Sequence, residues 1–314
     1  MKLEKLFGIG TILVGSFLAS TAQADRLTLN GAGASFPAPV YNVWTYSYSA
    51  AKLGAAVNYQ SVGSGAGINQ IKAGTVDFAG TDAPLTEKEC DEAGLIQIAM
   101  LKGAVTPIVN LGGKKKSAQP KTALKLSPDL LAALFLGTLT RWDDPKLQAL
   151  NPTLTLPKLP VTVVHRSDSS GTTFVYTSYL AAISTKWQEE VGVGASVKWP
   201  VGLGGQKNPG VCNSVKKVKG AIGYTEYTYA VESRLETVML QDATGTYVDP
   251  RSPSWPLMGT TYILVRKDLP PVKMDAVKAY LRWCFEQGGE AALRLHYAPL
   301  SADDTARALE TLGK

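Results

Sequence analysis

Three clusters of small polar residues stand where a strand should end and a helix should begin. They are Ala34-Ser35-Phe36, Gly63-Ser64-Gly65 and Ser169-Ser170-Gly171-Thr172. A helix start offers unpaired backbone N–H groups and partial positive charge, and nearby hydroxyl groups add further donors. One such cluster says little, because serine and threonine often serve as ordinary helix caps. Three in one chain favour an anion site built from helix starts.

Arg166 and Asp168 precede the third cluster and could serve the same anion. The planar guanidinium group of Arg166 suits an oxyanion, and Asp168 could orient it from two residues further along. The alternative interpretation is a surface ion pair with no part in binding.

Other chemistries fit this sequence less well. His165, Asp168 and Ser170 are the residue types of a serine hydrolase, but they crowd one segment and no Gly-x-Ser-x-Gly motif occurs. The stretch Gly31–Phe36 lacks the third glycine of a dinucleotide motif, and no phosphate-binding Gly-x-x-x-x-Gly-Lys motif occurs. Two histidines in the whole chain give no zinc spacing. We therefore expect no enzyme, no metal and no cofactor.

Alternating strands and helices would position the clusters. From Val40 to Ala51 apolar residues recur at helical spacing, and Gly54 ends the run. We expect strands at 27–30 and 56–59, a helix from Pro37 to Ala51, a short helix after the turn 63–67, and a strand ending at Thr81. Such alternation with short loops predicts a mostly parallel sheet covered by helices.

A weak internal echo appears in the second half of the chain. Residues 197–205 resemble residues 58–66, and each stretch precedes a helix that closes on a glycine-containing strand, 220–224 in the second case. Two lobes of similar construction would explain the echo, and chance similarity of glycine-rich turns is the alternative.

The first two dozen residues read as an export signal. Lys2 and Lys5 precede an apolar stretch from Leu6 to Ala19, and Ala22-Gln23-Ala24 has the small residues of a cleavage site. The apolar stretch falls short of the roughly 20 residues that a membrane span needs. We expect a secretory signal peptide at 1–24 and a mature chain that begins near Asp25.

Composition sets wider limits. The 314 residues predict about two domains, and 32 basic against 26 acidic side chains leave most of the charge compensated. The lysine runs at 114–116 and 216–219 lack the interleaved aromatic residues of a nucleic-acid platform. Cys90, Cys212 and Cys284 permit at most one internal disulfide, and the spacing of Cys284 favours a buried helical position.

Four segments together resemble the periplasmic phosphate-binding proteins (PstS family) of bacterial phosphate ABC importers. They are Leu29–Tyr41, Val76–Leu85, Arg166–Thr172 and Val197–Gly205. The resemblance implies an α/β, two-lobed periplasmic binding protein fold of type II. Each lobe would hold a mixed, mostly parallel sheet flanked by helices, and two hinge strands would join the lobes. The implied boundaries are 25–106 with 262–314 for lobe I and 107–261 for lobe II.

The resemblance also implies residue roles for one phosphate held between the lobes. Ser35 and Phe36 would donate from hydroxyl and backbone, Ser64 would donate from the second turn, and Asp82 would accept the phosphate proton. The other side would be closed by Arg166, Ser170, Gly171 and Thr172, and Asp168 would pair with Arg166.

The implied function is binding of inorganic phosphate in the periplasm and delivery to inner-membrane permease subunits with their ATPase. The protein would be a monomer without nucleic-acid partners. Gly65 stands where the family commonly has serine, and the segment 245–258 looks shorter than usual. A paralogue for another oxyanion and a phosphate sensor are therefore the open alternatives, with a hydrolase as a third.

Overall fold

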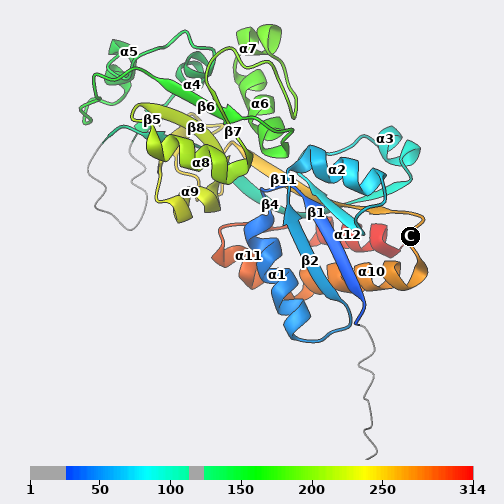
Figure 1. Ribbon diagram of the computed structural model, residues 1–314. Coiled ribbons are helices and arrows are strands. Elements are labelled where there is room, and N and C mark those ends of the chain that lie inside the picture. The colour runs from blue at the N-terminus through cyan, green and yellow to red at the C-terminus, as the bar shows by residue number, and fades with distance from the viewer. Residues whose placement is uncertain (1–25, 113–123, 314) are drawn as a thin grey trace, which may run out of the picture.

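The computed structural model describes residues 26–112 and 124–313. In Figure 1 these residues form two lobes of alternating strands and helices. The predicted signal peptide at 1–24 and the lysine run at 114–116 lie outside the described residues. Within the described residues, no helix is long and apolar enough to cross a membrane.

The first lobe begins with the predicted alternation. Its elements are β1 (Thr28–Gly33), α1 (Ala38–Ala50), β2 (Ala56–Ser61), α2 (Ser64–Lys72), β3 (Phe78–Thr81) and α3 (Glu87–Glu92). The three strands are parallel in the order β2-β1-β3. Helix α1 buries Val40, Trp44 and Tyr48, which are spaced four residues apart on one face.

The second lobe repeats this order with different residues. Its central elements are β6 (Thr162–Arg166), α6 (Gly171–Ile183), α7 (Thr185–Glu190), β7 (Leu203–Gly205), α8 (Lys207–Lys217) and β8 (Ala221–Glu226). The strands are parallel in the order β7-β6-β8, which matches β2-β1-β3 in the first lobe. The echo predicted from the sequence is therefore present in the topology.

Smaller elements complete the second lobe. They are β5 (Leu124–Leu126), α4 (Pro128–Phe135), α5 (Pro145–Leu150), α9 (Tyr227–Ser233), β9 (Glu236–Gln241) and β10 (Tyr247–Val248). Helix α4 starts as predicted, since the Ser127 hydroxyl accepts a hydrogen bond from the Leu130 amide at 3.4 Å.

Two long strands run from one lobe to the other (Figure 1): β4 (Leu95–Asn110) and β11 (Met258–Arg266). Strand β4 pairs with β11 up to Ala104 and with β8 from Val105 onward, always antiparallel. Strand β11 also pairs antiparallel with β3. The sheets are thus mixed, as predicted, and β4 changes partners between Ala104 and Val105. The lobe boundaries at 106/107 and 261/262 stay a prediction.

The C-terminal segment returns to the first lobe. It contains α10 (Pro271–Gln287), α11 (Gly289–Arg294), β12 (Ala298–Pro299) and α12 (Ala302–Gly313). The Trp44 indole donates to the Gly288 carbonyl oxygen at 2.9 Å, which ties α1 to the junction of α10 and α11. Cys284 lies buried on α10, as predicted, and all three cysteines are buried free thiols.

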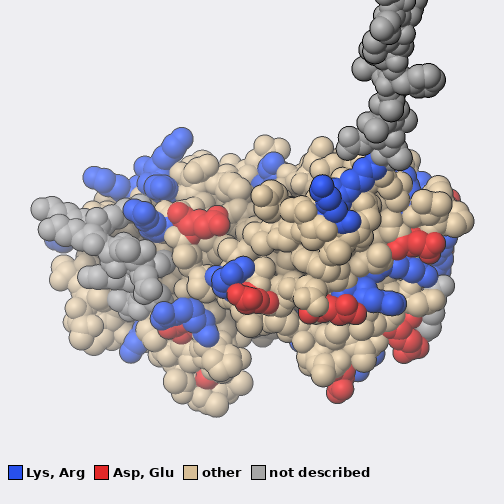
Figure 2. Space-filling view, turned by 90° about the horizontal axis from the view of Figure 1, so that it is seen from below, with Lys and Arg blue, Asp and Glu red and all other residues tan. Residues whose placement is uncertain are grey.

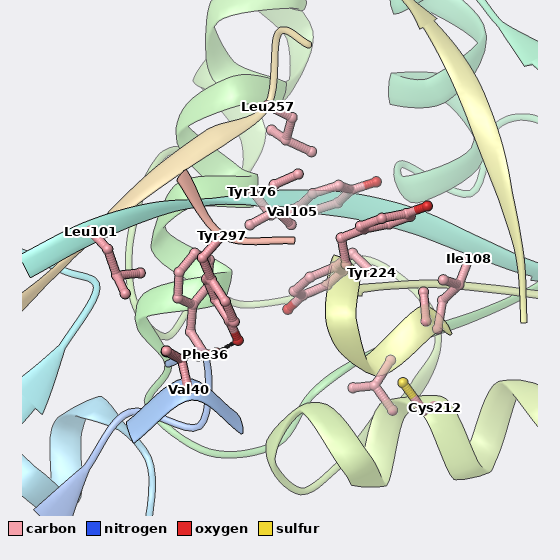
Figure 3. Close-up of a cluster of buried hydrophobic side chains, with 14 of the residues drawn as sticks. Phe36, Val40, Leu101, Val105, Ile108, Tyr176, Cys212, Tyr224, Leu257 and Tyr297 are labelled. Carbon is pink, nitrogen blue, oxygen red and sulfur yellow. Dashed lines mark hydrogen bonds between the residues drawn. The ribbon is translucent and has the colours of Figure 1, made fainter. Parts of the chain in front are cut away.

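Figure 3 shows part of one cluster of buried side chains around β4, to which Phe36, Val105, Tyr224 and Tyr297 belong. The Val105 amide donates to the Leu257 carbonyl oxygen at 2.9 Å, and the Trp255 indole donates to the Val105 carbonyl oxygen at 2.9 Å. On the surface shown in Figure 2, basic and acidic side chains are interspersed, in keeping with the compensated charge.

Replacing Trp255 with Phe removes the indole N–H that donates to the Val105 carbonyl oxygen, at the point where β4 changes partners. The Val105 carbonyl group then loses a buried partner, so we expect the free energy of unfolding to fall by about 1–3 kcal/mol. Chemical denaturation measures it. The control is Trp199→Phe, because Trp199 is half-buried and stacks on the His165 ring at 4.9 Å. Equal stability of the Trp255→Phe variant and the parent would contradict the role given to this bond.

Candidate anion-binding site

Helix starts from both lobes meet between the lobes. The Gly171 amide at the start of α6 donates to the Ser64 hydroxyl at the start of α2, at 3.0 Å. The Asn208 amide at the start of α8 donates to the Ser35 hydroxyl before α1, at 3.3 Å. Each bond joins a residue of the first lobe to one of the second. The three clusters singled out in the sequence therefore come together where the two lobes meet, a contact called the cleft below.

The predicted site residues are buried in this cleft. Ser35, Phe36, Ser64, Asp82, Arg166, Ser170 and Thr172 each expose at most 4% of their surface. The Ser170 hydroxyl accepts from the Thr173 amide at 3.1 Å and so caps α6. Such a hydroxyl keeps its own proton for a further acceptor.

Asp82 follows β3 and faces the start of α6. Its Oδ1 accepts from the Thr261 hydroxyl at 3.0 Å. Burial raises the pKa of Asp82 to about 7, although hydrogen bonds from Thr261 and Thr172 and the charge of Arg166 act in the opposite direction. Near neutral pH this carboxyl group can therefore exist in either form, as an acceptor or as a donor.

Arg166 and Asp168 form the pair that the sequence suggested, and it is not a surface pair. The guanidinium Nε donates to Asp168 Oδ1 at 2.8 Å and Nη2 donates to Oδ2 at 2.5 Å, with the Arg166 side chain 1% exposed. Burial opposes ionisation of Asp168, but the hydrogen bonds and charge of Arg166 outweigh it and hold its pKa below the usual range. The pair leaves little net charge in the cleft.

Asn208 joins these groups and was not predicted. It is fully buried at the start of α8, and its Oδ1 accepts from Arg166 Nη1 at 3.4 Å. Its Nδ2 donates to the Thr172 hydroxyl at 3.3 Å. The echo at 197–205 pointed to the helix that follows it, so a search of that helix start could have found Asn208.

Three tyrosine hydroxyl groups hold the loop 34–36, which the sequence also did not reveal. Tyr59 donates to the Ala34 carbonyl oxygen at 2.8 Å. Tyr229 donates to the Ser35 carbonyl oxygen at 2.6 Å, and Tyr297 donates to that of Phe36 at 2.6 Å. In a trans peptide unit the N–H group points opposite to the carbonyl group. Holding the Ser35 carbonyl group therefore fixes the direction of the Phe36 N–H.

The residues of the hydrolase alternative have other partners. The His165 ring stacks on Trp199, and its Nδ1 lies 3.0 Å from the Arg166 carbonyl oxygen. Asp168 is paired with Arg166, and Ser170 caps α6. This arrangement contains no nucleophile, base and orienting group in line. Among the described residues, no cluster of three or more His, Cys, Asp or Glu side chains could hold a metal ion.

Residues 19–287 match the sequence model of the PBP superfamily domain. The phosphate-binding protein PstS of Xylella fastidiosa is 39% identical over 310 residues, which cover 90% of this chain and 84% of that protein. PstS of Haemophilus influenzae is 41% identical over 312 residues, covering 90% of this chain and 91% of that protein. The chain belongs to the PstS family of phosphate-binding proteins.

A solved structure adds the fold to this assignment. A high affinity periplasmic phosphate-binding protein bound with phosphate aligns with a TM-score of 0.69 at 18% identity, covering 90% of this chain and 92% of that one. The two-lobed fold predicted from the PstS resemblance is thereby confirmed.

At Gly171 the two lobes approach each other closely. A Cβ added there would lie 2.6 Å from the Cβ, backbone nitrogen and Oδ2 of Asp82. Gly171→Ala should therefore keep the lobes further apart without harming either one. We expect a larger radius of gyration in small-angle X-ray scattering and an unchanged melting temperature.

The matched control is Gly289→Ala, because a Cβ added at Gly289 meets no described atom within 4 Å. A Gly171→Ala protein as compact as this control would show that closure does not depend on the small residue.

Proposed function

We propose that this protein binds inorganic phosphate in the cleft between its lobes and delivers it to a phosphate ABC importer. The relatives at 39% and 41% identity are named phosphate-binding proteins, and the fold neighbour was solved with phosphate bound. The observation that carries the proposal is a buried carboxyl group, Asp82, among neutral donors from two lobes.

Each predicted residue has a role in this proposal. Ser35, Ser64, Ser170 and Thr172 donate from hydroxyl groups, Phe36 and Gly171 donate from the backbone, Arg166 donates from its guanidinium group, and Asp82 accepts the ligand's proton. When phosphate binds, the Gly171 amide exchanges its bond to the Ser64 hydroxyl for a bond to the ligand. Asp168 orients Arg166 and balances its charge. All of these donors except Arg166 are neutral, and Asp168 compensates the charge of Arg166. The donors replace the water around the anion, so the cleft needs no excess of positive charge.

Asp82 would give the site its selectivity. At neutral pH phosphate still carries a proton and sulfate does not, so only phosphate can donate to an ionised Asp82. A site built around a required hydrogen bond can reject the analogue that lacks it by roughly 10⁴–10⁵. Closure would strengthen this selectivity, because water cannot reach the buried carboxylate. Beside sulfate, the carboxylate of Asp82 would then face an anion that has no proton to donate.

Closure of the lobes would be the signal that a transporter reads. In this proposal the segment 1–24 is a signal peptide, the mature protein works in the periplasm as a monomer, and its partners are permease subunits with their ATPase. It carries out no catalysis. The permease would contact only the surface of this protein. Closure would bring the rims of the two lobes together into one surface that the permease can recognise.

Calorimetric titration of the ligand-free protein with phosphate and then sulfate at neutral pH tests the proposal. We expect tight binding of phosphate, no heat with sulfate, and compaction in small-angle scattering when phosphate is added. Binding of sulfate alone, or of neither anion, would overturn it.

Asp82→Asn and pH test the selectivity residue. With a pKa of about 7, the acceptor form of Asp82 dominates above that pH and the donor form below it. Competition by sulfate against phosphate should therefore strengthen as the pH falls from about 8 to about 6. In Asp82→Asn, sulfate should compete better at every pH and the pH trend should vanish.

Asp77→Asn is the control, because Asp77 is a buried carboxyl group outside the cleft that pairs with Lys273 at 2.7 Å. An unchanged sulfate-to-phosphate ratio in Asp82→Asn would remove the selectivity role from Asp82.

A further inference from the structure

A second buried carboxyl group, Glu226, lies behind the anion site and has no role in the assignments above. It ends β8 and caps α9, and it is fully buried. Its Oε1 accepts from the Thr228 amide at 3.0 Å. Its Oε2 lies 3.0 Å from the hydroxyl oxygen of Tyr297, the side chain that holds the Phe36 carbonyl group.

The contacts of Tyr297 favour a proton on Glu226. The Tyr297 hydroxyl group has one proton, and the Phe36 carbonyl oxygen at 2.6 Å can only accept it. Figure 3 shows the Tyr297 ring turned toward Phe36, with this bond drawn. Once that proton is used, the hydroxyl oxygen can only accept from Glu226 Oε2. A carboxylate there would place two lone pairs face to face at 3.0 Å.

Thr228 shows the same shortage of protons. Its hydroxyl oxygen lies 2.5 Å from the Leu295 carbonyl oxygen and 3.1 Å from Glu226 Oε1. The hydroxyl groups of Thr228 and Tyr297 supply two protons for four contacts. A neutral Glu226 supplies a third, so the cluster is better satisfied with the carboxyl group protonated.

The surroundings of Glu226 also favour its neutral form. The titratable groups that act on it from α8, α9 and the C-terminal turn are Cys212, Tyr227, Tyr229, Glu232 and Tyr297. All of them become negative when they ionise. Two basic groups lie on the far side of Tyr227: the His296 ring packs on the Tyr227 ring at 5.3 Å, and the charge of Arg251 acts on both of these side chains. Burial raises the pKa of Glu226 to about 8.

We propose that Glu226 is a positioning residue of the anion site, which stays neutral and donates its proton to Tyr297 so that Tyr297 can hold the Phe36 carbonyl group. The proposal rests on the proposed phosphate function. Ionisation of Glu226 would draw the Tyr297 proton to the carboxylate and leave the Phe36 carbonyl group without its donor. The loop 34–36 would loosen, and with it the Ser35 hydroxyl and the Phe36 N–H.

The expected result is a loss of phosphate affinity at alkaline pH. From about pH 7 to about pH 9.5 Glu226 passes from mostly neutral to mostly ionised, and losing one hydrogen bond should weaken binding about three- to tenfold. Glu226→Gln keeps a donor for Tyr297 and an acceptor for Thr228 at every pH. It should bind like the parent at about pH 7 and keep that affinity at about pH 9.5.

The control is Glu286→Gln, which removes the same charge from an exposed position on α10, outside the set of groups that act on Glu226. It should follow the parent at all pH values. Calorimetric titration with inorganic phosphate across this range compares the three proteins. Parallel profiles for the parent and Glu226→Gln, or an equal loss of affinity by Glu226→Gln at all pH values, would overturn the proposal.

Two further measurements do not depend on the glutamine variant. Tyr297→Phe removes the hydroxyl group that connects Glu226 to Phe36. This variant should bind phosphate more weakly than the parent, and its affinity should not fall further at alkaline pH. Carbon NMR of the parent with labelled glutamate carboxyl groups should show one glutamate that titrates far above the others without any ligand. A parent that binds no phosphate at any pH would refute the proposed function. Normal phosphate binding with all glutamates titrating in their usual range would refute only the role of Glu226.

Discussion

The approach of Asp82 to the start of α6 is the constraint on which the rest of the site depends. A carboxyl group from the first lobe can reach the backbone of the second only because residue 171 has no side chain. This approach brings the Gly171 amide to the Ser64 hydroxyl and excludes water from Asp82. The raised pKa of Asp82 therefore follows from its burial where the two lobes meet.

Charge in the cleft is balanced at short range. Arg166 is neutralised by Asp168 at its side, and Asp82 and Glu226 have pKa values raised toward or above neutrality by burial. An isolated buried charge is costly, so each ionic group here has either a partner or a proton. The remaining attraction for an anion comes from oriented N–H groups, hydroxyl groups and helix starts, which act over short distances.

Local signals in the sequence predicted much of this architecture. The helical spacing in α1 and the cap at Ser127 each depend on neighbours in the chain. The glycine-rich stretch 63–67, predicted as a turn before a helix, instead forms the N-cap and first turn of α2. The echo between the halves predicted two lobes of similar construction, and the matching strand orders agree with it. The sequence did not reveal Tyr229 or Tyr297, because a buried tyrosine reads as core whichever way its hydroxyl group points. Their roles depend on which carbonyl group lies opposite, and only the tertiary fold decides that.

The path of β4 has a mechanical consequence. This strand is hydrogen-bonded to β11 on one side of Ala104 and to β8 on the other, and the returning chain at Leu257 is bonded to Val105. The strands that connect the lobes are therefore hydrogen-bonded along their length. When the lobes open, these paired strands must twist over a few residues. Paired strands of this kind resist bending in other directions. Their backbone is also hydrogen-bonded, which protects the connection from proteolysis. The two lobes should consequently remain one cooperative unit even while they swing.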